Sequence, residues 1–318
     1  MLLTREYLLA LKSLEGIGVK KLMKIGNHIE KYGISIDSTA DLVSVLKDLG
    51  INVNKEPVSK ELLDEALLSA KRTIEYNERL GIGITTFYDD DFPAALRTAI
   101  NEEGKLDPPM ILYYKGDLSI ANVPSIAVIG TREITSFGEK AGAYLTKEFV
   151  KRGLCIVSGL AIGCDTVGHK TALESNGKTI AILAHGLDMV YPPENEALAQ
   201  EIVDKGGLLL SEYSVGTNVF RYNLVARDRL QAGLALATLV IQTGEQGGTM
   251  HAANTTLKSN KPLYAVKFSV PEQNIHEKSL GNELLVRKGA KYITAEDDYD
   301  RIVEAILHHK CISQDLFG

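Results

Sequence analysis

The sequence lacks tryptophan and contains only three cysteines among its 318 residues. Their odd number argues against a disulfide framework, and the absence of CxxC spacing argues against a thiolate zinc site, so we expect reduced thiols and no metal. No stretch approaches the roughly 18 consecutive apolar residues of a membrane span. Charged residues also interrupt the apolar part of residues 1–16, which argues against a secretory signal. We therefore expect a cytoplasmic protein with no cofactor and no membrane partner.

A basic composition is also missing, because the net charge is −6. Nucleic-acid binding usually leaves a basic footprint, so this value argues mildly against such a partner. The charge is unevenly distributed, however. Residues 124–268 carry 14 Lys and Arg against 13 Asp and Glu, whereas residues 1–123 carry 15 against 19 and residues 269–318 carry 6 against 9. The least acidic region is therefore the middle one, which weakens the objection.

Residues 1–80 show apolar residues at three- and four-residue spacing, which predicts helices. Gly16 and Gly18 separate two apolar helical turns, with Lys20 and Lys21 beside them. Two interpretations fit this pattern. One is a helix-hairpin-helix whose glycine amides approach a phosphate, and the other is an ordinary tight turn between helices.

From residue 124 the sequence changes to short apolar runs that alternate with helical segments. The expected strands are 126–129, 154–157, 179–183, 208–210, 239–242 and 263–266. Between the first two, apolar residues recur every four positions, with Ser136 as the expected N-cap and Gly153 at the expected end of the helix. The pattern predicts an α/β fold with a mostly parallel sheet and helices on both faces.

Four segments are expected along the chain. They are a helical domain over residues 1–80, a bridging segment over 81–123 that packs on the main domain, a Rossmann-like domain over 124–298, and a C-terminal helix or tail over 299–318.

Four of the expected strands end in small or glycine-rich loops, at residues 130–132, 158–161, 184–187 and 243–249. In a doubly wound sheet, ligands collect beyond the carboxyl ends of the strands, where backbone amides are unpaired. Glycine lets a polyanion lie against the backbone, and Arg132 adds a planar guanidinium that can hold a phosphate with two hydrogen bonds. The four loops together indicate an anionic ligand of nucleotide type. The competing interpretation is that these glycines only close tight turns.

The order and content of these motifs resemble the DNA-processing protein A (DprA/Smf) family across about residues 85–298. The matching pieces are Tyr88, Phe92 and Pro93, then 107–109, 112–116, 129–132, 158–165, His169, Ala172 and Leu173, 177–181, 191–195, Ser211 and Glu212, 227–229, 232–234, 247–249 and 281–290. The helical N-terminus resembles the SAM-like domain that precedes the Rossmann-like domain in that family.

The resemblance implies a homodimeric, non-catalytic recombination mediator that binds single-stranded DNA and helps load a RecA-type recombinase during natural transformation. It maps the Gly-Ser-Arg turn of the family's DNA pocket onto residues 130–132, and its Arg-Asn-Arg segment onto 227–229. Lys178 and Arg221 are weaker phosphate candidates. The residues expected to bind nucleic acid are Gly130, Thr131, Arg132, Ser158, Gly159, Lys178, Gly186, Arg221, Arg227, Arg229, Gly247, Gly248 and Thr249.

Three departures from the family pattern stand out. Asp228 replaces the central Asn of the Arg-Asn-Arg segment, residues 266–268 replace the usual Val-Pro-Gly, and we expect no C-terminal winged helix of the kind that some members possess. These departures favour a specialised branch with a partner or pathway other than transformation. Two rival functions also stay open. One is a sensor of a nucleotide-derived signal, for example in defence against foreign DNA. The other is an enzyme similar to nucleotide phosphoribohydrolases, in which Glu245 would act at the ribose.

Overall fold

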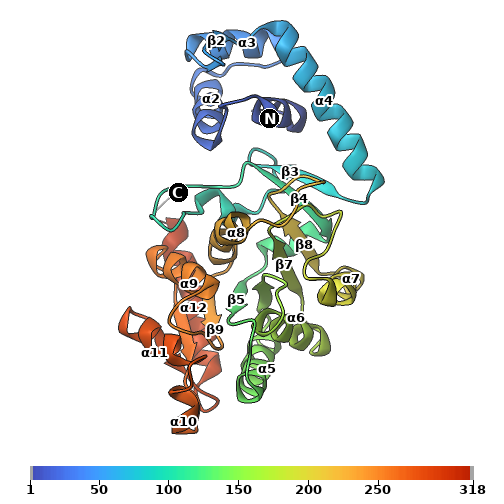
Figure 1. Cartoon of the computed structure of the whole chain (residues 1–318). Helices are drawn as coiled ribbons and strands as arrows, with labels where there is room; N and C mark the ends of the chain where they lie inside the picture. The colour runs from blue at the N-terminus through green and yellow to red at the C-terminus, as the bar shows by residue number, and fades with distance from the viewer. Residues whose placement is uncertain (1–2, 316–318) are drawn as a thin grey trace. The chain divides into compact units, whose positions relative to one another are not determined.

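The computed structural model describes the backbone of residues 3–315 and the side chains of residues 3–308 (Figure 1). Two compact units emerge. The first runs to Phe92 and includes Pro108–Tyr114, and the second consists of Pro93–Asp107 and the chain from Lys115 onward. The predicted bridging segment, 81–123, is thus divided between the units. Residues 316–318 of the expected C-terminal tail lie outside the described part.

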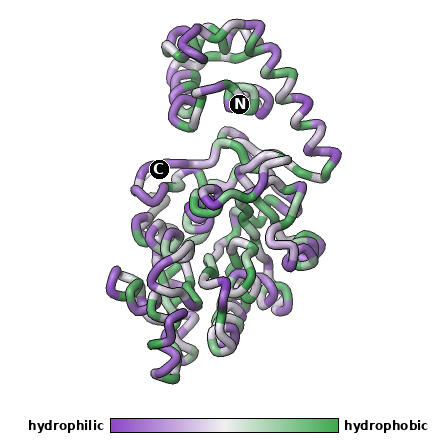
Figure 2. Tube along the Cα trace, in the orientation of Figure 1, coloured by the Kyte–Doolittle hydropathy of each residue, from purple (hydrophilic) through white to green (hydrophobic). Residues whose placement is uncertain are grey.

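The first unit is mainly helical. Its elements are α1 (Arg5–Ser13), α2 (Val19–Tyr32), α3 (Thr39–Asp48), β1 (Asn52–Val53), β2 (Glu56–Pro57), α4 (Lys60–Arg79) and β3 (Gly83–Thr86), which pairs antiparallel with β4 (Ile111–Gly116). Hydrophobic and hydrophilic residues alternate along α4, and Leu63, Ala66 and Ala70 form its buried face (Figure 2). Gly16 adopts a positive φ of 74°, and Gly18 is the N-cap of α2. The expected turn between two helices is therefore present.

A parallel sheet forms the centre of the second unit. Its strand order is β11-β10-β9-β5-β6-β7-β8. The bounds are β5 (Ser125–Ile129), β6 (Cys155–Ser158), β7 (Thr179–Leu183), β8 (Leu208–Ser211), β9 (Ala237–Val240), β10 (Leu263–Val266) and β11 (Lys291–Ile293). The chain runs outward from β5 to β8 in one direction and then returns to β9 on the other side of β5. This reversal between β5 and β9 is the switch point at which doubly wound sheets bind ligands.

Helices cover both faces of this sheet, as expected. Their bounds are η1 (Ala94–Thr98), η2 (Leu118–Asn122), α5 (Ser136–Lys151), α6 (Cys164–Glu174), η3 (Pro193–Asn195), α7 (Glu196–Asp204), α8 (Arg221–Leu234), α9 (Gly248–Lys258), α10 (Pro271–Asn274), α11 (Leu280–Arg287) and α12 (Tyr299–Asp315). Val128 and Leu239 belong to one buried cluster with residues of α5, α6 and α12. Thr238, the residue before Leu239 in β9, faces the other side of the sheet, where its hydroxyl forms a hydrogen bond with the hydroxyl of Thr256 on α9. Alternation along the strands therefore places α9 on the opposite face.

The helix α5 shows how local sequence sets these elements. Its N-cap is Thr135, whose hydroxyl accepts a hydrogen bond from the amide of Gly138 at 3.1 Å, so the predicted cap at Ser136 is one residue too late. At the other end, Gly153 takes a positive φ of 80° just after the C-cap Arg152, as its position predicts. Phe149 and Leu145 are buried on the face toward the sheet, while Phe137 is partly buried against Phe268.

Two further sequence features can be located in the structure. Cys155 and Cys164 are buried free thiols, whereas the side chain of Cys311 lies outside the described residues. Across residues 3–315, no helix combines the length and the apolar character needed to cross a membrane.

Candidate functional site

The loop after β5 is fixed by contacts with the residues that follow β9 and with the start of α6. The amide of Thr131 donates to the backbone oxygen of Gln242 at 2.7 Å, which ties this loop to the end of β9. A Cβ at Gly130 would collide with the Cys164 side chain and the same Gln242 oxygen. Gly163, with a φ of 84°, leaves equally little space beside the backbone of Thr131. Only glycine at these two positions lets the loops approach so closely, so Arg132 stands on a rigid support.

Two cavities meet at Arg132. The first, which we call the glycine cavity, has a volume of about 340 Å³ and lies between the loops at 129–133 and 243–249. The second, which we call the apolar cavity, has a volume of about 270 Å³ and is lined largely by residues 159–162, 183–185 and 191–194. Arg132 and Arg227 line both. The predicted convergence of strand-end loops is therefore present at the switch point of the sheet.

The guanidinium of Arg132 is exposed, and no residue of the described part of the chain forms a hydrogen bond or an ion pair with it. An exposed planar donor without a partner is well placed to hold a phosphate by two hydrogen bonds. Opposite it, Gly247 has a φ of 126° and serves as the N-cap of α9, so the amides of the first turn of α9 face the glycine cavity. A helix N-terminus favours anions.

The charge of the glycine cavity is balanced rather than basic. Arg132, Arg227 and Lys278 line it, but so do Glu133, Asp165 and Asp228. Lys278 forms an ion pair with Glu133. A phosphate entering this cavity therefore competes with the protein's own carboxylates, as the acidic composition predicts.

Arg227 lies at the bottom of the site, with only 8% of its surface exposed. One of its donors reaches the backbone oxygen of Ile182, and with its amide oxygen turned inward Gln231 accepts from Arg227 Nη1 at 3.2 Å and from the Gly159 amide at 2.9 Å. The Asp165 carboxylate accepts from the amides of Leu160 and Ala161 at 3.3 and 3.2 Å. Burial raises the pKa of Asp165, while the charge of Arg227 opposes that rise.

Gly159 is the residue that permits this arrangement. A Cβ there would collide with both the Asp165 carboxylate and the Arg227 guanidinium. We expect Gly159→Ala to displace Arg227 and weaken anion binding by about tenfold, because a charge-assisted contact is worth roughly 1.5 to 3 kcal/mol. Inorganic phosphate binding followed by calorimetry would measure this. Unchanged affinity in Gly159→Ala would contradict the expectation.

Several residues expected at the site lie elsewhere or are already engaged. Ser158 donates to the Val128 oxygen at 2.6 Å and is fully buried. Lys178 precedes β7 and so lies at the amino edge of the sheet, opposite the strand-end loops, where it donates to the Lys205 oxygen. Gly186 follows β7 but packs against the loop at 214–215. Gly247, Gly248 and Thr249 do line the glycine cavity.

The two outer arginines of α8 differ sharply. Arg221, in the first turn, is exposed. Arg229 has 7% of its side chain exposed and pairs with both Glu212 oxygens at 2.9 and 2.8 Å and with Asp107 at 2.8 Å. The sequence predicts that Arg227 and Arg229 point differently around the helix, and they do. The hydrogen bonds and ion pairs of Arg229 therefore stabilise the fold.

His185, which the sequence did not single out, also lines the site. His185 is 2% exposed in the apolar cavity, and its Nε2 has no hydrogen-bond partner among the described residues. Its burial lowers its pKa. Nearby in the sequence of α8, Phe220 and Tyr222 are 44% and 68% exposed and stack on each other with centroids 5.4 Å apart. The sequence offers no signal for His185.

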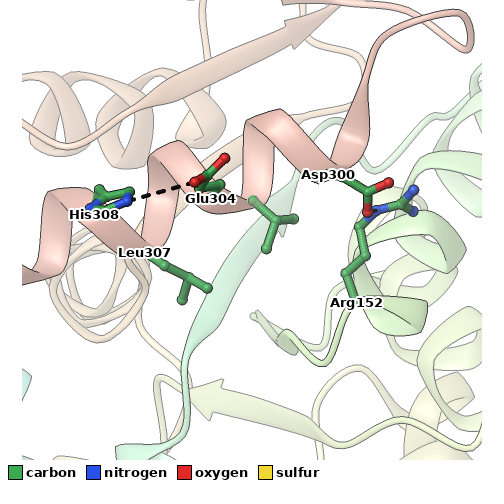
Figure 3. Close-up of a pocket in the computed structure, with 6 residues that line it drawn as sticks. Arg152, Asp300, Glu304, Leu307 and His308 are labelled. Atoms are coloured by element: carbon green, nitrogen blue, oxygen red, sulfur yellow. Dashed lines mark hydrogen bonds and ion pairs between the residues drawn. The ribbon is translucent and has the colours of Figure 1, made fainter.

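A third cavity lies at the other edge of the sheet. It has a volume of about 510 Å³ and is lined by Arg152, at the end of α5, and by one face of α12 (Figure 3). Asp300 forms an ion pair with Arg152, and Glu304 lies 3.8 Å from His308 along the same helix (Figure 3). Because its carboxylates outnumber its cations, this cavity is a poor match for a phosphate.

Comparison with known proteins is unambiguous at the family level. The model of the family described as DNA recombination-mediator protein A matches residues 83–304. Protein Smf of Synechocystis is 30% identical over 92% of this chain and 71% of its own length, and the DNA processing protein DprA of Streptococcus pneumoniae is 33% identical over 60% of this chain and 66% of its own.

Two solved structures are similar to this fold. The structure of DNA processing protein A from S. pneumoniae has a TM-score of 0.73 at 26% identity, covering 92% of this chain and 95% of that one. A structure of DNA processing protein A from Helicobacter pylori, described for its single-stranded DNA binding mode, has a TM-score of 0.59 at 30% identity and covers 71% of this chain and 96% of that one.

Proposed function

Because the chain belongs to the DNA recombination-mediator protein A family, we propose that it binds single-stranded DNA at the two cavities around Arg132. The observation that carries this proposal is the exposed, unpaired guanidinium of Arg132 at the switch point of the sheet. Successive phosphates lie on the loop at 130–132 and on the first turn of α9, where Gly247, Gly248 and Thr249 offer backbone amides. Arg221, exposed in the first turn of α8, is a further candidate for a phosphate contact.

A titration of fluorescent oligo-dT with the purified protein at several salt concentrations tests the proposal. Each phosphate contact to a single strand contributes about −0.7 to the slope of log affinity against log salt, so two or three contacts predict a slope between about −1.4 and −2. We expect micromolar or tighter binding at low salt. An absence of binding at low salt would overturn the proposal.

The finer parts of the proposal come from the family. They are a homodimer in the cytoplasm, a RecA-type recombinase as protein partner, a role in natural transformation, and binding without catalysis. The rival enzyme is less well supported, because Glu245 is exposed on its loop and the lining of the glycine cavity passes from Gly244 to Gln246. Release of free base from nucleoside monophosphates, lost in Glu245→Gln, would favour the enzyme instead.

The exposed, stacked rings of Phe220 and Tyr222 are candidates to stack on the bases of the DNA. Aromatic side chains that stack on bases contribute about 1 to 3 kcal/mol per base, so Tyr222→Ala should weaken oligo-dT binding by about fivefold or more. An abasic oligonucleotide of the same length is the control, because it keeps the phosphates and removes the stacking partner. Equal losses for both oligonucleotides would contradict a stacking role.

A further inference from the structure

Asp228 is the residue that the proposed site explains least. It lies on α8 next to Arg227, with 8% of its surface exposed, and it lines the glycine cavity. Its Oδ1 is 3.3 Å from Arg227 Nε. Its Oδ2 faces the start of α9, about 4.0 Å from where a Cβ of Gly248 would be. The carboxylate therefore stands between a buried arginine and the helix terminus expected to receive a phosphate.

Arg227 has one donor that Asp228 alone faces. Its Nη1 is used by the Ile182 oxygen and by Gln231, as described above. Its Nε is buried and forms no hydrogen bond within the described part of the chain, so the Asp228 carboxylate is its charge partner at 3.3 Å. The state of Asp228 consequently decides whether this part of the guanidinium is neutralised.

The surroundings of Asp228 oppose its ionisation. Burial raises the pKa of Asp228 to about 7, and Arg227 lowers it less than burial raises it. The carboxylates of Asp165 on α6 and Glu102, in the segment before β4, act in the same direction as burial, whereas His251 on α9 opposes it. His251 in turn pairs with Glu102.

We propose that Asp228 is a proton-controlled gate on the anion site. When ionised, it neutralises Arg227 and repels a phosphate at the first turn of α9. When protonated, it leaves the Nε side of Arg227 without a carboxylate partner and can donate a hydrogen bond to a phosphate oxygen. This inference rests on the proposed function, because the gated ligand is the phosphate of a single strand. Asp228, which departs from the family pattern, would then set the affinity for DNA.

The sign of the effect follows from linkage. A bound phosphate favours the protonated form of Asp228, so binding takes up a proton and affinity falls as pH rises through 7. If phosphate binding raises the pKa of Asp228 by about one to two, affinity changes by about five- to tenfold between pH 6 and pH 8. Replacement by Asn keeps the shape and removes the titration. The variant should bind equally at both pH values, as tightly as the unchanged protein does at pH 6.

The test is oligo-dT anisotropy at constant ionic strength at pH 6 and pH 8, because thymine and phosphodiester groups do not titrate between them. The unchanged protein, Asp228→Asn and Asp228→Ser are compared, and the serine variant replaces the asparagine one if that fails to fold. His251→Gln is the matched control, because His251 acts on the Asp228 carboxyl and pairs with Glu102. The gate predicts a pH effect that survives in His251→Gln and vanishes in Asp228→Asn.

The possible failures are distinct. Loss of the pH effect in His251→Gln, or its retention in both Asp228 variants, overturns the gate while leaving DNA binding intact. Absence of oligo-dT binding at either pH overturns the proposed function itself.

Discussion

Arg132→Glu is expected to weaken oligo-dT binding by about 100-fold at low salt. The substitution removes a charge-assisted, bidentate contact worth roughly 1.5 to 3 kcal/mol and places a carboxylate where the phosphate would lie. Because Arg132 is exposed and without a partner among the described residues, the fold should be unaffected. The slope of log affinity against log salt should also become shallower by about 0.7, which corresponds to one phosphate contact.

The matched control is Arg301→Glu, which makes the same charge change on α12 at the amino edge of the sheet, next to the Asp300–Arg152 ion pair. In about 0.1 M salt it should leave affinity within about twofold, because exposed charges beyond one Debye length, about 10 Å at that ionic strength, are largely screened. Arg132→Lys should fall between, since lysine keeps the charge and loses the planar pair of donors. Equal effects of Arg132→Glu and Arg301→Glu would place the DNA elsewhere.

The sheet was largely predictable because its strands are buried on both faces. Runs at 179–183 and 263–266 coincide with β7 and β10, and the boundaries of the other four predicted strands differ by at most two residues. The clearest shift is β9, predicted over 239–242 and observed at Ala237–Val240. Its start is set by pairing, because Ala237 lies opposite Ile126 of β5. Gln242 instead leaves the ladder, and its side chain accepts hydrogen bonds from Thr135.

The sequence predicts the place of a site residue only where the order of strands and loops along the chain fixes that place. Loops at the carboxyl ends of parallel strands must share one edge, so 130–132 and 243–249 could be paired from the sequence. Lys178 precedes its strand and the same rule places it at the opposite edge, so its proximity in sequence to the loop after β7 is misleading. The partners of Arg229 are Glu212 and Asp107, 17 and 122 residues away, and no local pattern predicts such pairs.

Arg229→Met is expected to lower the free energy of unfolding of the α/β unit by about 3 kcal/mol. The guanidinium is nearly fully buried and holds Glu212, Asp107 and the backbone oxygen of Ala226 together. Nearby Glu212 and Asp107 favour the charged form and raise the pKa of Arg229, while burial opposes this. Removing one partner of a buried pair leaves uncompensated charge and typically costs 3 to 5 kcal/mol. The lower figure applies because Glu212 and Asp107 retain 19% and 35% of their side-chain exposure.

Circular dichroism during urea unfolding measures this loss, since the chain has no tryptophan to report by fluorescence. Arg287→Met is the matched control, because Arg287 pairs with Glu283 on the surface of α11 with 72% of its side chain exposed, and such pairs are worth under about 1 kcal/mol. The measurement also separates the two arginines of the segment 227–229. A small change in stability with a large loss of oligo-dT affinity in Arg229→Met would return Arg229 to the proposed DNA site, whereas its buried ion pairs assign it to the fold.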